Sequence, residues 1–357
     1  MSAPHGGHGD AAPLNGRRGA RAHGAPLVVV GDVLLDVDVE GVTRRRCPDS
    51  PAPVVEVYDE RSRPGGAGLA ARLAARHGGV TAVVGLGDDG DGARLGTMLQ
   101  EYARVVRLPL RGRTPRKTRV LAQGRTVARL DHGDGRAVPG PIDTSAERAL
   151  RGAGAVLVSD YGRGVAAHPA IRRLVAAAAE RGVPVVWDPH RAGPHPVPGV
   201  TLATPNETEA AAFAGLSGQP GADAAEDAAD AAEGVPRPPG GSRRGGAGGP
   251  QDVAELLRDA WGCAGVAVTC GARGAVLARA GESPRFARAP EAPAEADTCG
   301  AGDAFAAEAA LALRAGASVT EAVTKAVARA SAFVAGGGVR ALPRARYEVA
   351  SAGGESR

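Results

Sequence analysis

Short runs rich in β-branched residues alternate along this chain with segments typical of helices. The first run, residues 27–30, is apolar and ends at Gly31, as a buried parallel strand would. After Gly65 and Gly66, the leucine spacing of 69–76 predicts a helix. Further strands are predicted at 80–84, 155–158, 183–187, 201–203 and 266–269, and further helices at 169–181 and 206–215. The alternation predicts an α/β protein with a mainly parallel central sheet covered by helices on both faces.

A second pattern interrupts these units. In 37–57, apolar residues such as Val37 and Val39 alternate with polar ones, which is typical of a half-exposed antiparallel flap. Segments 117–122 and 125–131 flank Gln123-Gly124 and predict a hairpin. We expect the hairpin to complete the flap and form a small lid of about 37–57 and 117–131.

Three segments contain few apolar side chains that a folded core could bury. Residues 1–25 are rich in Gly, Ala, His and Arg and predict a disordered leader, while 217–250 predict a disordered insertion within the domain. Residues 344–357 are polar and predict a loose tail. The expected folded domain therefore covers 26–343, and its chemistry should survive deletion of the insertion.

Composition excludes several classes of function. Hydrophobic residues make up 43% of the chain, enough for a buried core, and the formal net charge is only +4. Arginine pairs and triplets are short, scattered and without interleaved aromatics, so we expect no nucleic-acid partner. No run of eighteen apolar residues and no secretory signal occurs, so we expect no membrane partner. Four widely spaced cysteines fit a reduced, cytoplasmic protein.

One turn is suited to binding phosphate. The sequence Asp297-Thr-Cys-Gly-Ala-Gly-Asp303 precedes an Ala-rich segment with strong helix propensity. The N–H groups of Gly300, Ala301 and Gly302 would lie at a helix start, where backbone donors and the helix dipole attract anions. Asp303 could then take a proton from an attacking hydroxyl. A Gly-rich turn with an Asp cap is the structural alternative, and Cys299 is a filler of the turn or a reactive thiol.

Taken with four further motifs, this turn resembles the signature of the PfkB, or ribokinase-like, family of carbohydrate kinases. The accompanying motifs are Val28–Asp36, Arg63–Gly68, Thr204–Glu209 and Val268–Gly274. Within the family, the chain is similar to heptose 7-phosphate kinases, the kinase half of bifunctional heptose kinase/adenylyltransferase proteins. The segments that carry this similarity are Gly31–Asp36, Pro48–Val55, Lys117–Leu121, Arg129–Asp131 and Val158–Gly164. No His-x-Gly-His element follows, so we expect phosphorylation without adenylylation.

The resemblance implies a ribokinase-like three-layer sandwich with a small β-lid, and it implies roles for single residues. Asp303 would be the catalytic base, with the amides of Gly300, Ala301 and Gly302 as anion hole. Asp36, with Asp32 as a weaker companion, would bind sugar hydroxyls, and Gly65 and Gly66 would let the backbone approach the sugar. Either aspartate could instead cap a turn.

The resemblance also implies a nucleotide and metal site. Asn206 and Glu209 would organise Mg²⁺ through its water shell, because Mg²⁺ prefers hard oxygen ligands and retains water. An N-cap role for Asn206 is compatible with this. The ATP-binding residues would be Asn206, Glu207, Thr208, Glu209, Thr269, Gly271, Gly274 and Ser331. Whether a monovalent cation also assists the turn is left open.

Two positions depart from the heptose-kinase pattern. Leu69 stands where those kinases usually carry an Asn, and an apolar group cannot replace an amide's donors and acceptors. His190 follows Asp188-Pro189 where a Lys is common, and a neutral His is the poorer phosphate partner. For the phosphate already on the sugar, the best donors are Lys117, Arg119 and Arg129 on the flap hairpin; solvated strand-edge charges are the alternative.

These residues predict an ATP-dependent kinase that phosphorylates the anomeric hydroxyl of D-glycero-D-manno-heptose 7-phosphate. A kinase for another sugar or sugar phosphate is the alternative, and so is a weakly active sugar- or nucleotide-binding regulator. An exposed strand edge on the lid would invite pairing, so we expect a homodimer through the lid.

Overall fold

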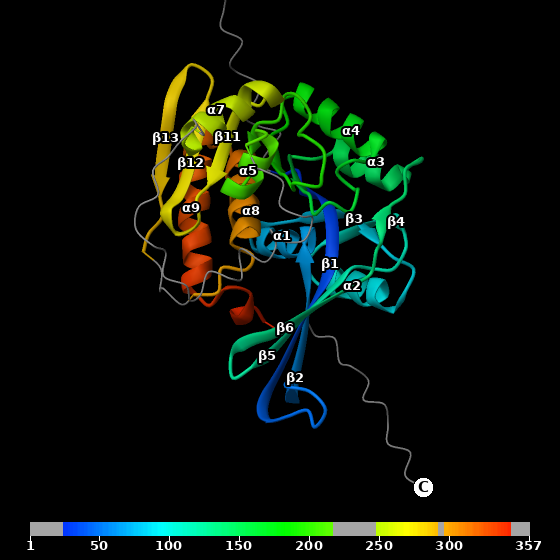
Figure 1. Cartoon of the computed structure of the whole chain (residues 1–357). Helices are drawn as coiled ribbons and strands as arrows, with labels where there is room; N and C mark the ends of the chain where they lie inside the picture. Colours follow the sequence, from blue (N-terminus) through cyan, green and yellow to red (C-terminus); the bar gives the residue numbers. More distant parts are fainter. Residues whose placement is uncertain (1–23, 217–247, 292–295, 344–357) are drawn as a thin grey trace, which may run out of the picture.

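The protein has a central sheet between two helical layers, with a smaller sheet projecting from one end (Figure 1). The computed structural model describes residues 24–216, 248–291 and 296–343. Residues 1–23 of the expected leader, 217–247 of the expected insertion, and the whole expected tail lie outside these ranges. Within the described residues, no helix is long and apolar enough to cross a membrane.

Seven parallel strands form the middle of the central sheet, in the order β11-β10-β9-β8-β1-β3-β4. The edges are antiparallel: β12 and β13 extend one side, and β7 pairs with β4 on the other. The bounds are β1 Leu27–Arg46, β3 Val80–Leu86, β4 Arg104–Arg111, β7 Arg136–Ala137, β8 Ala155–Ser159, β9 Val185–Asp188, β10 Leu202–Ala203, β11 Gly265–Thr269, β12 Gly274–Arg279 and β13 Glu282–Arg288.

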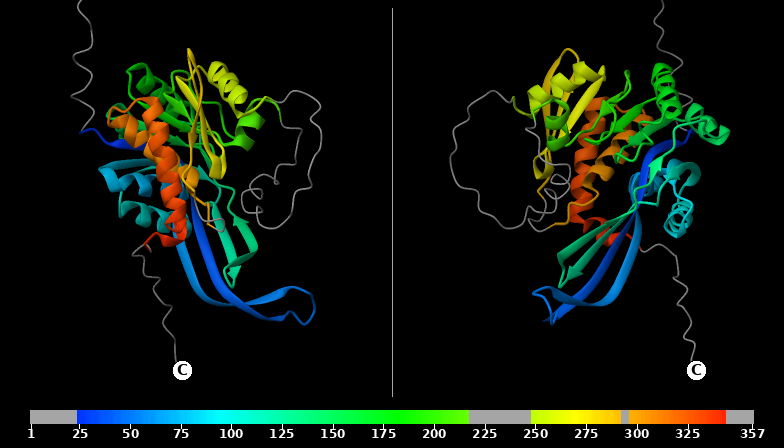
Figure 2. Two further views of the ribbon diagram at one scale, coloured as in Figure 1. Left: turned by 90° about the vertical axis from the view of Figure 1, so that its left-hand side faces the viewer. Right: turned by 45° about the vertical axis from the view of Figure 1, so that its right-hand side comes forward.

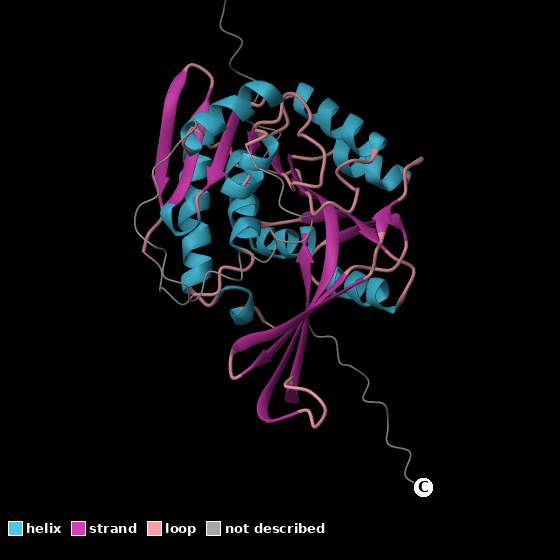
Figure 3. Ribbon diagram, in the orientation of Figure 1, coloured by secondary structure: helices cyan, strands magenta, loops and turns pink. Residues whose placement is uncertain are grey.

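Helices cover both faces of this sheet, and each layer closes its own apolar core (Figure 3). One layer consists of α1 (Ala67–Ala74), α2 (Gly90–Gln100), α8 (Ala301–Arg314) and α9 (Val319–Ala335). The other consists of α3 (Thr144–Arg151), α4 (Pro169–Glu180), α5 (Glu207–Phe213) and α7 (Pro250–Trp261). Short 3₁₀ turns η1 (Ala75–His77), η2 (Gly271–Arg273) and η3 (Gly338–Ala341) complete the elements. The predicted three-layer α/β fold is therefore confirmed.

Strand β1 corrects one prediction. The strand does not end at Gly31 but extends over 20 residues in all, from the central sheet into the lid. Gly31 is there because of a close approach, not a turn: a Cβ would lie 1.9 Å from the carbonyl oxygen of Ser159 on β8. A single long strand thus connects the core rigidly to the lid.

The lid is a four-stranded sheet in the order β2-β1-β5-β6, and Figure 2 shows it extending away from the core. Its other strands are β2 (Pro53–Gly66), β5 (Arg116–Ala122) and β6 (Arg125–His132). Gln123 and Gly124 both have positive φ, as a two-residue hairpin turn requires. The flap and hairpin segments predicted from the sequence lie in these strands.

The sequence patterns did not predict several of the observed helices and strands. They are α2, α3, α7, β4, β7, β12 and β13. Most are short or half-exposed; β13, for example, alternates between partly buried and exposed residues. Helix α7 begins at Pro250, so the end of the predicted insertion was set too late. Pro at the first helical position and Asp252 at N3, whose carboxylate accepts from the Gly249 N–H, start that helix.

Candidate active site

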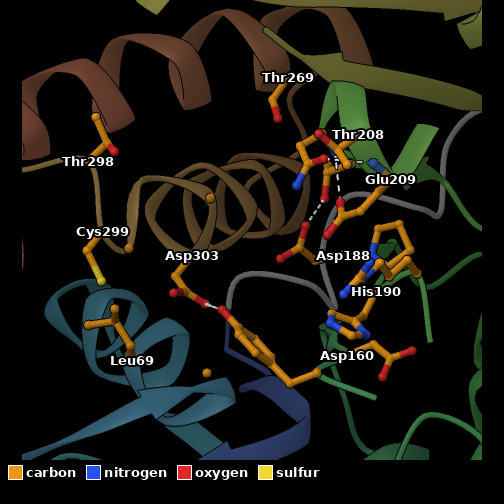
Figure 4. A pocket seen from close by; sticks show the side chains of 18 of the residues that line it. Leu69, Asp160, Asp188, His190, Thr208, Glu209, Thr269, Thr298, Cys299 and Asp303 are labelled. Carbon is orange, nitrogen blue, oxygen red and sulfur yellow. Dashed lines mark hydrogen bonds between the residues drawn. The ribbon is translucent and has the colours of Figure 1, made fainter. Parts of the chain in front are cut away.

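A cavity of about 550 Å³ lies where the carboxyl ends of the core strands face the lid (Figure 4). The ends of β8, β9 and β10 contribute Asp160, Asp188 and Thr204, and the lid strands contribute Asp36 and Lys117. In open α/β sheets, ligands bind outside the carboxyl ends of the strands. The first turn of α8 forms the remaining wall, so the cavity is the candidate site.

The start of α8 presents backbone donors to the cavity. Gly300 is the N-cap, with φ 81, a left-handed conformation that favours glycine. The N–H of Ala301 donates to the carbonyl of Thr298 at 3.0 Å. Among the described residues, the N–H groups of Gly300 and Gly302 have no hydrogen-bond partner. The cavity-facing donors are therefore those of Gly300 and Gly302, and the predicted contribution of Ala301 is corrected, because a neighbouring carbonyl already occupies its amide.

Asp303 lies in the first turn of α8, only 5% exposed, and lines the cavity. The Tyr161 hydroxyl donates to its Oδ1 at 2.9 Å. Burial, followed by the negative charge of Asp188, raises the pKa of Asp303 well above its ordinary value, while the Tyr161 hydrogen bond and Lys117 act in the opposite direction. A carboxylate with a raised pKa is a stronger base than an exposed one.

Besides Glu207, three further carboxyl groups line the core side of the cavity. Burial raises the pKa of Asp188 to about 6, although Thr204 donates to its Oδ1 at 2.8 Å. Burial and the charges of Asp188 and Asp160 raise the pKa of Glu209 to about 8. Burial and the Asp32 carboxylate raise the pKa of Asp160. Burial and mutual repulsion thus disfavour negative charge on this wall, so a polyphosphate bound here would need an accompanying cation.

The start of α5 is fixed by reciprocal capping. Asn206 Oδ1 accepts from the Glu209 N–H at 2.8 Å, and Glu209 Oε2 accepts from the Asn206 N–H at 2.9 Å. Glu207 forms an ion pair with Arg273 of η2. Asn206 also bridges to Thr269, at the end of β11. Asn206 to Glu209 thus line the cavity beside Thr269 and Gly271, so these residues, all predicted to bind ATP, lie together.

The lid side of the cavity is charged and internally paired. Asp36 lies 3.8 Å from Arg63 Nε, and burial raises its pKa although Arg63, Arg119 and Lys117 lower it. A Cβ on Gly65 would lie 2.5 Å from Asp36 Oδ2, so this glycine makes room for the carboxylate. Gly66 lines the cavity, whereas Gly65 only supports Asp36.

All three predicted phosphate donors line the cavity, each with partners on the lid. Arg119 Nε lies 3.3 Å from Asp38, and its Nη2 donates to Cys299 Sγ at 3.2 Å. Arg129 makes two hydrogen bonds to Asp131, at 3.0 and 2.8 Å. Lys117, opposite Asp36 across the β1–β5 pair, lies near enough to Asp303 to lower its pKa. The lid therefore presents an ordered positive surface.

Comparison with known proteins identifies the family to which this chain belongs. Residues 25–237 and 246–345 match the model of the pfkB family carbohydrate kinases. The chain belongs to this family. It is 47% identical over 340 residues to the bifunctional protein HldE of Streptomyces coelicolor. The aligned region covers 95% of this chain and 66% of that relative. The chain thus spans about two thirds of the length of this curated relative.

Solved structures of pfkB-type enzymes have the same fold. Arabidopsis thaliana ribokinase, complexed with ribose and ATP, is 23% identical and has a TM-score of 0.61, covering 90% of this chain and 96% of that one. Escherichia coli phosphofructokinase-2, in complex with potassium, is 18% identical and has a TM-score of 0.61, covering 88% and 94%. The family confirms that the chain is a phosphotransferase acting on an alcohol group.

In addition to Gly65 and Ala301, three predicted site residues do not line the cavity of this pfkB kinase. Asp32 is 2% exposed, and its carboxylate accepts the N–H groups of Tyr161, Arg163 and Val165, so it holds a loop and is shielded from a sugar in the cavity. Gly274 does not line the cavity; its missing Cβ permits close contact with Ala287 of β13. Ser331 on α9 does not line it either.

Sequence reasoning gave no role to several cavity residues, among them Asp160, Tyr161, Asp188, Thr204 and Thr298. Asp188 directly follows one predicted strand and Asp160 lies two residues beyond another, and this position was the signal that could have identified them as site residues. Tyr161 had no comparable signal. For Cys299, burial raises the pKa to about 11, which contradicts the reading as a reactive thiol and favours the filler role.

Both departures from the heptose-kinase pattern face the site. A Cβ on Gly300 would lie 2.6 Å from Leu69 Cδ2, so Leu69 packs against the helix start that carries the free amides. His190 lines the cavity, and its Nδ1 accepts from the Ala192 N–H at 3.1 Å. Leu69 therefore contributes apolar packing where an amide side chain would contribute hydrogen bonds.

Proposed function

We propose that this chain transfers the γ-phosphoryl group of ATP to the anomeric hydroxyl of D-glycero-D-manno-heptose 7-phosphate, giving the 1,7-bisphosphate. The observation that carries the proposal is the position of Asp303, buried beside the Gly300 and Gly302 amides, between a lid wall and a core wall of one cavity. The heptose is supported by the motifs of heptose 7-phosphate kinases and by the likeness to HldE. We place the reaction in the cytoplasm, where ATP and sugar phosphates are made.

The residues have separable tasks in this reaction. Asp36 accepts hydrogen bonds from sugar hydroxyls, and Asp303 takes the proton of the anomeric hydroxyl. The freed oxygen attacks the γ-phosphorus as the bond to the β–γ bridging oxygen breaks, and ADP leaves. The amides of Gly300 and Gly302 stabilise the charge on the transferring group. Asn206 to Glu209, Thr269 and Gly271 hold the nucleotide.

The residues at the start of α5 fit Mg²⁺ held through water. Capping occupies Asn206 Oδ1 and Glu209 Oε2, and Glu209 Oε1 remains as a hard oxygen donor. Within the described ranges, no group of three or more His, Cys, Asp or Glu side chains is arranged to hold a metal directly. Mg²⁺ characteristically keeps waters and binds through one or two carboxylates and substrate phosphates. Bound there, it would neutralise charge on the phosphates and on Glu209.

A monovalent cation also fits beside the turn. The carbonyl oxygens of Asp297 and Cys299 lie 2.9 and 3.8 Å from where a Cβ on Gly338 would be. Two backbone carbonyl oxygens close to a position without a side chain could serve as ligands for such an ion. We include potassium in the proposal, and activity in potassium compared with sodium tests it; equal rates would remove it.

The role of Asp303 is tested by Asp303→Asn. We expect transfer to fall by about 10²–10⁴-fold, because the variant loses the base but keeps the amides. ADP release measures transfer, and calorimetry should find ATP binding nearly unchanged. Glu308→Gln, on the same helix but outside the cavity, is the matched control and should retain activity. Equal rates for Asp303→Asn and the native chain would refute the assignment.

The sugar is tested with a panel of sugars and sugar 7-phosphates assayed with ATP, with the product's phosphate position read by ³¹P NMR. Heptose 7-phosphate should be the best acceptor, and Lys117→Ala should raise its KM more than that of any phosphate-free sugar. The contact of Leu69 with Gly300 favours the second candidate, a kinase for another sugar. ATP binding without transfer to any member would instead indicate a regulator.

We also propose a homodimer formed through the lid. Apolar side chains are exposed on β2 and β6, including Val57 at 57%, Tyr58 at 67% and Leu130 at 48%. In the described residues, β2 pairs only with β1, and β6 only with β5. Light scattering should give twice the chain mass, and Tyr58→Glu should reduce it. A monomer at all concentrations would contradict the proposal.

A further inference from the structure

We propose that Tyr161 is a positioning residue for Asp303, and that Asp32 and Gly66 hold Tyr161 in place. This inference rests on the proposed function, because Asp303 is the base in that reaction. It gives a task to three residues of separate motifs: Gly31-Asp32, the glycine pair at 65–66, and the segment Val158–Gly164. Only the fold brings these motifs together.

The first step is the contact with the base. The Tyr161 hydroxyl donates to Asp303 Oδ1 at 2.9 Å, the bond drawn at Asp303 in Figure 4. Both residues line the cavity. A hydrogen bond to one carboxylate oxygen fixes the plane of the carboxyl group and leaves Oδ2 to face the acceptor. Tyr161 therefore orients the base without reacting itself.

The second step is the support from Asp32. This carboxylate is 2% exposed and accepts three backbone N–H groups of the loop after β8, from Tyr161 at 3.0 Å, Arg163 at 2.9 Å and Val165 at 3.0 Å. Hydrogen bonds to an ionised group are about twice as strong as neutral ones. Asp32 thereby fixes the backbone that carries the Tyr161 ring.

The third step is the space left by Gly66. This residue has φ 60, and a Cβ on it would lie 2.6 Å from the Asp32 carbonyl oxygen and 3.2 Å from Tyr161 Cδ2. Any side chain here would displace the strand or push the tyrosine ring away from Asp303. The lid strand β2 thus ends at a residue whose small size is needed for the tyrosine contact.

The consequence is a defined effect on proton transfer. Asp188 and Asp36 face Asp303 and disfavour its charge, whereas Lys117 and the Tyr161 hydroxyl favour it. Losing the Tyr161 bond therefore raises the pKa of Asp303. The protonated acid cannot act as a base, so the acid limb of the rate profile moves to higher pH.

Kinetics against pH test this inference. Tyr161→Phe keeps the ring and removes the hydroxyl, so we expect kcat to fall about tenfold at low pH and to recover towards the native value at high pH. Tyr102→Phe is the matched control, because the Tyr102 hydroxyl donates to the Gly68 carbonyl at 3.2 Å, outside the cavity. Its profile should match the native one. An unshifted acid limb, or a loss equal at every pH, would overturn the proposal.

A second measurement does not depend on activity. With ¹³C-labelled aspartate, the carboxyl titration of Asp303 is identified by its loss in Asp303→Asn and should move to higher pH in Tyr161→Phe. Asp32→Asn should cause a smaller shift in the same direction. If no sugar is phosphorylated but the titration moves, the proposed function fails and the positioning role stands. An unmoved titration overturns the positioning role even in an active kinase.

Discussion

The two halves of strand β1 are stabilised in different ways. In the central sheet, the side chains of residues 27–30 are apolar and fully buried, with Leu27, Val28 and Val29 at 0% exposure. In the lid, Asp36 and Asp38 follow on the same strand, and their partners are arginines. The backbone is continuous, so the contrast comes entirely from side chains and their surroundings.

The contrast explains how the enzyme combines a stable sheet with a charged site. Apolar burial stabilises the core half by about 25 cal/mol per Å², without needing any one partner. In the lid half, Asp38 is buried against both Arg63 and Arg119, so each charge depends on the others. Breaking one buried ion pair costs more than the pair contributes, because the remaining charge stays buried.

The largest effect is expected from Asp38→Ala. It leaves Arg63 and Arg119 without their shared carboxylate, and we expect the lid to be destabilised by about 3–5 kcal/mol. Hydrogen exchange of the lid amides and the KM for the sugar measure this. Glu56→Ala removes an exposed partner of Arg44 and should change stability by less than about 1 kcal/mol. Similar values for both variants would remove the contrast between buried and exposed lid charges.

A comparable but global effect is expected in the core half. Leu27→Ala should reduce the free energy of unfolding by about 2–5 kcal/mol, because it opens a cavity in a packed layer. Urea denaturation measures the change. Val57→Ala on the exposed lid surface is the control, with an expected change within about 0.5 kcal/mol. A cost confined to the core, with hydrogen exchange of the lid amides unchanged, would show that β1 does not couple the two sheets.

The last prediction concerns the core wall of the site and is measured only as a change of stability with pH. The folded-state pKa of Glu209 is raised from 4.5 to about 8, so the folded protein binds its proton more tightly than the unfolded chain does. This contribution to stability is present below pH 4.5 and is lost as pH rises towards 8. In Glu209→Gln that loss should be absent, while the amide oxygen still caps Asn206. Denaturation at several pH values measures it; identical pH dependence in both proteins would contradict the raised pKa.

Local features of the sequence were sufficient to predict several elements of the fold. The helix start at Gly300 followed from glycines before an Ala-rich segment, and the β5–β6 hairpin followed from Gln123-Gly124, whose left-handed conformation suits a tight turn. The parallel sheet followed from apolar runs alternating with helices. Half-exposed elements such as β13 could not be predicted, because their pattern is weak without the neighbours that bury one face.

What the sequence determined by itself was the family, the α/β layering and the position of Asp303, because these depend on periodicity and on turn chemistry within a few residues. The tertiary structure alone decided that Asp32 holds a loop, that Tyr161 contacts the base, and that Ala301 has no amide to offer. A carboxylate's role depends on which donors surround it. Those donors lie more than a hundred residues away along the chain for Asp32, so only the folded arrangement selects among its possible roles.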